Sequence, residues 1–144
     1  MIAEEINNYN HKHLFIMQPI KNTMISHGLF YKILYSNNNF TSNGLYLKMD
    51  FKATKWLNGR LIFDIEPNKE IMNMIVNIEK YILDKIDNTK RAHYKIYEQI
   101  KNGNFKTSNS NPSIVLKISG VWENENTLGI SYKIITINEL INLQ

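Results

Sequence analysis

The chain of 144 residues is 43% hydrophobic and 21% charged, which is typical of one folded domain and excludes an intrinsically disordered protein. It contains no cysteine, which excludes disulfides, thiolate metal ligands and a cysteine nucleophile, and favours an intracellular protein. No apolar run approaches the roughly 18 residues of a membrane span, and the net charge of +4 is compatible with a polyanionic partner.

The first 13 residues are polar and predict a mobile N-terminal arm or a short helix ahead of a single domain over residues 14–144. Glu4 and Glu5 stand where a secretory signal would carry positive charge. His11 and His13 have no acidic partner close in the sequence, so we interpret them as solvated side chains and expect no metal site.

Four strands are predicted in the N-terminal half of the domain. Residues 14–17 form a short apolar run that precedes Pro19, which indicates an edge strand. Residues 29–35 are rich in aromatic and β-forming side chains. Residues 45–51 and 60–65 alternate between apolar and polar side chains, as half-buried strands do, and we expect a loop between them that carries Trp56.

Two helical segments follow Pro67. Isoleucines recur at spacings of three and four up to Ile86, which predicts an amphipathic helix with Asn68 as a candidate cap. A second helical piece is predicted over residues 91–101 and ends at Asn102-Gly103, a common helix stop. The polar residues 104–112 predict a loop.

The C-terminal part predicts a β-hairpin with strands at residues 114–123 and 128–134. Every second side chain at the start of the first strand is apolar, and Lys117 lies on the other face. Lys133 holds the same position in the second strand, and Trp122 lies at the end of the first. An apolar face opposite a lysine-bearing face is required of a nucleic-acid-binding sheet and is also found in ordinary solvated hairpins.

With the short strand at residues 14–17 set apart as an extra N-terminal segment, the order strand, strand, strand, helix, strand, strand predicts a mainly β, α+β fold. A five-stranded antiparallel barrel with a helical insertion between strands 3 and 4, the oligonucleotide/oligosaccharide-binding (OB) fold, has this order. An open α+β sheet with the helices on one side is the alternative.

Each of the five main strands carries one basic residue on the face opposite its predicted core. Tyr46 and Phe30 lie on these faces, Trp56 and Trp122 lie in adjoining loops, and Asp50 and Asp64 partly offset the positive charge. Bases stacked on these aromatic rings and phosphates bound by the basic side chains would form a nucleic-acid-binding groove. Trp122 is predicted either as a stacking residue or as a plug that closes the barrel end, and we favour the plug. The predicted nucleic-acid-binding residues are Lys32, Tyr46, Lys48, Trp56, Arg60, Lys117, Trp122 and Lys133.

Several segments resemble a family of small OB-fold proteins from large nucleocytoplasmic DNA viruses, the single-stranded-DNA-binding proteins of the podovirus replication type. The most specific is Lys117-Ile118-Ser119-Gly120-Val121-Trp122-Glu123, and looser likeness extends over residues 14–137. The resemblance implies a non-enzymatic protein that coats single strands during viral DNA replication, recombination or repair in the infected host cell, at a nuclear or cytoplasmic site. It also implies viral replication proteins as partners, although residues 138–144 hold one acid and depart from the acidic tail of such proteins.

Alternatives from other classes are a nuclease and a protein-interaction module. Asp50-Phe51-Lys52 has the acid-x-lysine spacing of metal-dependent nucleases, but no acid lies between Glu5 and Asp50 to complete a metal site. His93 has no evident acid or nucleophile partner. We therefore expect neither catalysis nor a cofactor. The remaining alternative is a structural or interaction module that forms a homodimer or binds a viral or host protein.

Overall fold

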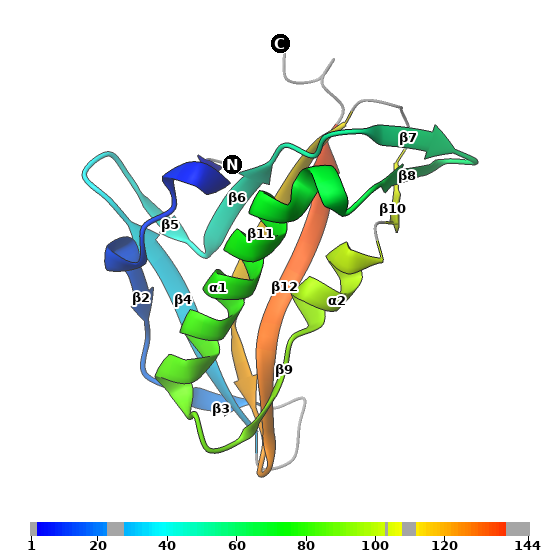
Figure 1. The fold of residues 1–144 in the computed structure, drawn as a ribbon. Coiled ribbons are helices and arrows are strands. Elements are labelled where there is room, and N and C mark those ends of the chain that lie inside the picture. The colour runs from blue at the N-terminus through cyan, green and yellow to red at the C-terminus, as the bar shows by residue number, and fades with distance from the viewer. Residues whose placement is uncertain (1–2, 23–27, 103, 108–111, 138–144) are drawn as a thin grey trace.

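The computed structural model describes residues 3–22, 28–102, 104–107 and 112–137. In this part of the chain nine strands form one large mixed sheet and three more form a small antiparallel sheet. Both α-helices lie on the same side of the large sheet, and the small sheet projects from one end of it (Figure 1). The strands of the large sheet are β1 (Glu4–Glu5), β2 (Leu14–Ile16), β3 (Ile20–Asn22), β4 (Gly28–Ser36), β5 (Thr41–Asn43), β6 (Leu45–Met49), β9 (Arg91–His93), β11 (Ser113–Glu123) and β12 (Thr127–Ile137).

The predicted five-stranded barrel is wrong, because the large sheet stays open. Closure requires every strand to pair on both edges. The strand predicted third, β8 (Arg60–Phe63), leaves the large sheet and pairs with β7 (Thr54–Leu57) and β10 (Asn104–Lys106) instead. The outer edge of β12 is taken by the short parallel strand β9. The observed architecture is therefore the alternative, an open α+β sheet with helices on one side.

The long strand β11 is the centre of the large sheet. Its first half pairs with β6, its second half pairs with β4, and its whole length pairs with β12. A bulge between Ile118 and Gly120 separates the two halves. Opposite this bulge, Gly44 joins β5 to β6 with a φ of +102°, and a Cβ there would lie 3.1 Å from the carbonyl oxygen of Ile118. One continuous segment thus changes partner from β4 to β11.

The predicted long helix is confirmed as α1 (Lys69–Ile86), which buries Ile75, Ile78 and Ile82. Asn68 makes no side-chain cap bond. Instead its amide, buried at 2% exposure, accepts a hydrogen bond from the Lys52 backbone N–H and donates to the Asp64 carbonyl. Asn68 therefore fastens the start of the helix to the chain that leaves the large sheet.

The second predicted helix, over residues 91–101, is confirmed only in its C-terminal part. Residues 91–93 form strand β9, and α2 spans Lys95–Lys101. The first backbone N–H groups of this short helix would lack partners, but the Glu79 carboxylate of α1 accepts hydrogen bonds from Ile96 N (3.0 Å) and Tyr97 N (3.1 Å). Burial raises the pKa of Glu79, and these two hydrogen bonds partly oppose that shift.

The small sheet occupies two segments that were predicted as loops, because β7 lies within residues 53–59 and β10 within residues 104–112. Asn58 and Gly59 both have positive φ, as a two-residue hairpin turn requires. Aromatic rings pack on the inner face of the small sheet. The Phe63 ring is stacked on the Phe51 ring, with their centroids 4.3 Å apart, and its centroid lies 5.8 Å from that of Phe105.

The segment predicted as an arm packs against the domain. Glu4 and Glu5 pair in parallel with β6, and Ile6 is buried. The 3₁₀ turns η1 (Ile6–Asn8) and η2 (His11–His13) follow, and Tyr9 stacks on Tyr35 at 5.8 Å. The predicted C-terminal tail, residues 138–144, lies outside the described residues.

Candidate nucleic-acid interface

Directly paired residues of neighbouring strands place their side chains on the same side of a sheet. Lys117 of β11 is paired with Tyr46 of β6 and with Lys133 of β12. Tyr132 points the other way, because its hydroxyl is hydrogen-bonded to Gln99 of α2 at 2.6 Å. Lys117, Tyr46 and Lys133 therefore lie on the side away from the helices, which we call the open face.

The same pairing extends the open face along both halves of β11. Tyr31 lines a cavity against α1, so its neighbours Phe30 and Lys32 point to the open face. Phe30 is paired with Trp122, and Lys32 with Gly120. The open face includes Glu5, Ile20, Phe30, Lys32, Tyr46, Lys48, Arg91, His93, Val115, Lys117, Gly120, Trp122, Thr127, Gly129, Ser131, Lys133 and Ile135.

Aromatic rings form a row across the end of this face. Trp122 is paired with Phe30 on one side and with Gly129 on the other, and His93 follows beyond Gly129. A Cβ at Gly129 would lie 2.5 Å from the Trp122 ring. The Trp122 ring therefore lies against the sheet where only glycine leaves room, and the His93 ring lies 5.8 Å from it.

The Phe30 ring also lies against a glycine of the sheet, Gly120. A Cβ at Gly120 would lie 2.5 Å from the Phe30 ring. Both rings are half-buried, so each is supported by the backbone beneath it and still meets solvent. Supported aromatic rings on a sheet surface are suitable platforms for stacked bases.

Lysines extend from the aromatic row along the open face, first Lys32 beside Phe30 and then Lys117, Lys133 and Lys48 farther along β11. The Lys117 ammonium lies over the Tyr46 ring at 5.5 Å from its centroid. Lys48 is 3.8 Å from Glu5, a half-exposed pair in which solvent weakens the attraction. Lys32 and Lys133 are exposed. Glu5 is the one carboxylate in the set of residues that defines the open face, which leaves this face positive.

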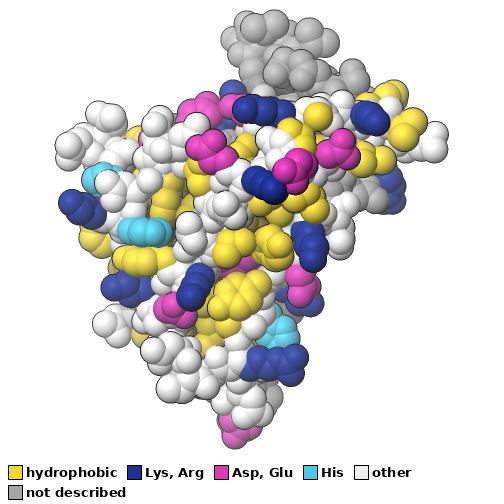
Figure 2. Space-filling model, viewed as in Figure 1, with side chains coloured by type: hydrophobic (Ala, Val, Ile, Leu, Met, Phe, Trp, Pro, Cys, Tyr) yellow, Lys and Arg dark blue, Asp and Glu magenta, His cyan; other side chains and the backbone are white. Residues whose placement is uncertain are grey.

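The helix-covered side differs in charge as well as in shape. Acidic and basic side chains are intermingled there (Figure 2). Two of its ion pairs are local ones, between Lys69 and Glu66 at 2.8 Å and between Lys95 and Glu98 at 3.7 Å. The charge on that side is therefore balanced over short distances, unlike the charge on the open face.

Most of the predicted binding residues meet on the open face: Lys32, Tyr46, Lys48, Lys117, Trp122 and Lys133. Trp56 and Arg60 do not join them. They lie in the small sheet, where Trp56 is 44% exposed and its indole N–H donates to the Thr107 carbonyl at 3.4 Å. Arg60 is paired with Leu57 and Lys106. The expectation of one groove through all five main strands fails with the barrel.

Comparison with protein-family models, with curated proteins and with solved structures finds no match to this chain. What the open face can do must therefore be argued from its own geometry. The prediction that Trp122 plugs a barrel end is wrong, because an open sheet has no barrel end to close.

Three open-face residues were missed by the predicted set. Phe30 was placed on this face by its alternation but was left out of the binding residues. Arg91 and His93 were assigned to a helix, although Arg91-Ala92-His93 alternates as a strand does. This three-residue signal is too short to outweigh the helical pattern that follows it.

In the described ranges no group of three or more His, Asp or Glu residues is arranged to hold a metal ion. The Asp50-Phe51-Lys52 segment is held by Asn68, whose side chain bonds both the N–H and the carbonyl of Lys52. No helix in those ranges is long and apolar enough to cross a membrane.

Proposed function

We propose that this protein binds single-stranded nucleic acid, DNA in particular, on the open face of its large sheet and catalyses no reaction. The observation that carries the proposal is the register of β11. It brings two flat aromatic rings and four lysines from separate strands onto one face that neither helix covers.

The aromatic rings and the lysines of the open face would have different roles. Unpaired bases can stack on Trp122 and Phe30, and each stacked base contributes about 1–3 kcal/mol. Lys32, Lys48, Lys117 and Lys133 would bind phosphates, and their contribution falls with salt. A duplex hides its base faces, so the aromatic row favours single strands.

The family resemblance of the sequence suggests the biological setting. It supports a role in viral DNA replication or recombination within an infected host cell, with viral replication proteins as partners. The barrel that this resemblance implied is absent, so the proposed role rests on the open face and not on the OB fold.

Replacing the lysines tests this proposal. We expect the quadruple variant Lys32→Gln, Lys48→Gln, Lys117→Gln, Lys133→Gln to lose most of its affinity for a fluorescein-labelled oligothymidylate. Four phosphate contacts on a single strand correspond to a slope of about −3 in log K against log salt, or about a fifty-fold loss between about 50 and 200 mM salt. Fluorescence anisotropy across this range would measure the slope.

A matched control removes exposed lysines that lie outside the open face. The variant Lys12→Gln, Lys69→Gln, Lys80→Gln, Lys101→Gln changes exposed residues and also lowers the net charge from +4 to zero. It should keep the wild-type slope. Equal losses in the two variants would mean that net charge, and not the open face, determines binding, and would refute the proposal.

A homodimer formed through the small sheet is the second candidate. All four residues of its edge strand β7 are exposed, and Leu57 and Ile62 are 57% and 36% exposed. An exposed edge strand that carries apolar side chains such as Trp56 and Leu57 is suited to pair with a second copy. Size-exclusion chromatography of the wild type and of Leu57→Lys decides this: a dimer that the substitution converts to a monomer supports it, and a wild-type monomer at high concentration excludes it.

A further inference from the structure

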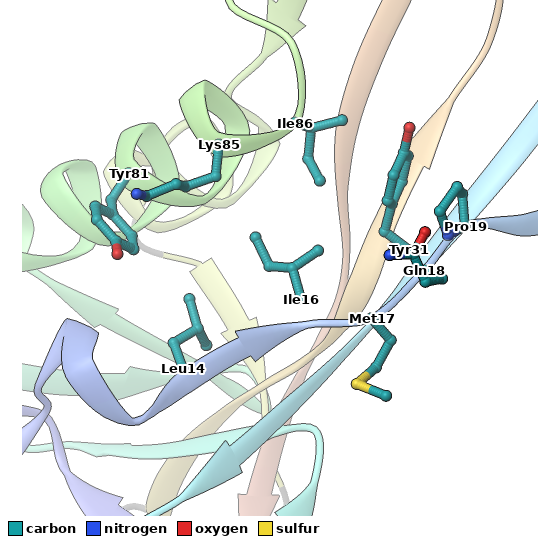
Figure 3. Close-up of a pocket in the computed structure, with 9 residues that line it drawn as sticks. All are labelled: Leu14, Ile16, Met17, Gln18, Pro19, Tyr31, Tyr81, Lys85 and Ile86. Carbon is teal, nitrogen blue, oxygen red and sulfur yellow. The ribbon is translucent and has the colours of Figure 1, made fainter.

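A cavity of about 410 Å³ lies on the helix-covered side, where α1 ends beside β2 and β4. Figure 3 shows Leu14 and Ile16 pointing from β2 toward the helix, with Tyr31 on the far side. The volume is within the range of small-ligand sites. This cavity is separate from the open face, so a ligand bound in it would be independent of nucleic-acid binding.

The cavity exists because two elements stop short of each other. The chain leaves α1 at Asp87 in an extended conformation, so no further turn covers the sheet. The edge strand also bulges: β2 and β3 pair with β4 in registers that differ by one residue. The bulge contains Pro19, which has no N–H to pair with a neighbour.

The cavity lining combines an apolar strip, which we call the floor, with polar surface from Gln18, Tyr31, Tyr81 and Lys85. Leu14, Ile16 and Ile86 supply aliphatic surface. At one end the Tyr31 hydroxyl donates to Glu123 at 2.7 Å, and Glu123 is also 3.0 Å from Lys90. Desolvation and this hydrogen bond raise the pKa of Tyr31 to about 12. The carboxylate at this end, Glu123, is therefore already paired with Tyr31 and Lys90.

The other end carries a cation without a carboxylate partner. Lys85 forms no salt bridge with any described residue; its ammonium lies 5.3 Å from the centroid of the Tyr81 ring. The His11 ring stacks on Tyr81 at 3.7 Å and fixes its position. Burial, and secondarily the charge of Lys85, lower the pKa of His11, so His11 adds no competing positive charge at neutral pH.

We propose that this cavity binds a small amphipathic carboxylate, with its apolar body on the floor formed by Leu14, Ile16 and Ile86 and its carboxylate beside Lys85. The apolar floor favours an aliphatic chain, because burying aliphatic surface there removes it from contact with water. The lone cation selects the negative head group, since a charge-assisted hydrogen bond is stronger than a neutral one.

Decanoate is a suitable probe, used below its micelle-forming concentration with protein labelled at the isoleucine methyl groups. Titration followed by NMR should give saturable shifts at Ile16 and Ile86, whose signals are assigned from Ile16→Val and Ile86→Val. Decanol, which lacks the charge, and acetate, which lacks the chain, should bind more weakly. No saturable shift at either isoleucine would overturn the proposal.

Lys85→Gln tests the charge and should fold, because the side chain is exposed on α1. We expect it to weaken decanoate about tenfold and to leave decanol unchanged. Lys80→Gln, an exposed lysine of the same helix outside the cavity, is the control and should bind decanoate as the wild type does. Equal affinity of Lys85→Gln and wild type for decanoate would also overturn the proposal.

Discussion

The two faces of the large sheet are built from alternate residues of the same strands, yet they differ in kind. The face under the helices is filled by aliphatic side chains such as Leu47 and Leu116, which are at most 1% exposed. The open face carries lysines and half-buried rings from the positions in between, such as Lys48 and Lys117. Stability and the proposed binding are therefore separable one residue at a time, because a single step along a strand crosses the sheet.

The largest expected effect is the difference in stability between alanine substitutions at two neighbouring positions, one on each face of the sheet. Leu116→Ala should destabilise the protein by about 2–5 kcal/mol, because it leaves a cavity in the core. Lys117→Ala should cost no more than about 1 kcal/mol, since it leaves no cavity in the core and removes only the contact with the Tyr46 ring. Urea unfolding measures both, and similar losses would contradict the assignment of the two faces.

Two glycines on the open face give a finer contrast. A Cβ at Gly120 would lie 2.3 Å from the backbone oxygen of Tyr31, so Gly120→Ala must shift a strand and should cost about 1–3 kcal/mol. At Gly129 the new atom meets the Trp122 ring, a side chain that can move.

Gly129→Ala should therefore cost less stability than Gly120→Ala and weaken oligothymidylate binding by displacing the Trp122 ring. Thermal unfolding and anisotropy titration of both variants test this order. If Gly129→Ala keeps full affinity, the flat position of Trp122 is not needed for binding.

The smallest expected effect is the pH dependence of stability that comes from Glu79, the buried carboxylate of α1. The raised pKa of Glu79 means that the folded state holds its proton more tightly than the unfolded chain, whose ordinary value is 4.5. Stability from this group is thus present at low pH and lost as the pH rises through the folded pKa.

Glu79→Gln removes this titration but also one of the two acceptors for the N–H groups of α2. We expect the stability of the wild type relative to the variant to fall as the pH rises above 4.5, the ordinary pKa of Glu79. Urea unfolding at several pH values would measure it. A difference that stays constant or moves the opposite way contradicts the role of burial at Glu79.

Alternation along single strands made much of the open face predictable. Tyr46, Lys48 and Lys117 share a face because each is out of phase with the apolar residues beside it. The partners of each strand were not predictable in this way. Arg60 alternates as clearly as Lys48 does, but its strand pairs in the small sheet, and that choice depends on the packing of Phe51, Phe63 and Phe105.

The short elements were also beyond the sequence signal. Strand β9 is three residues long and is defined by its parallel pairing with β12, a contact between distant parts of the chain. The supported position of Trp122 depends on Gly129, which lies across the hairpin and has no side chain to reveal a pattern. Such features follow from tertiary pairing and not from local periodicity.

The two tryptophans of the chain allow the most direct test of the central claim, because one lies on the open face and the other in the small sheet. Single-tryptophan variants Trp56→Phe and Trp122→Phe would be titrated with oligothymidylate at low salt, and intrinsic fluorescence would be recorded. We predict quenching in Trp56→Phe, where Trp122 remains, and little or none in Trp122→Phe. Quenching confined to Trp56, or no binding by the wild type, would contradict the open face as the nucleic-acid interface.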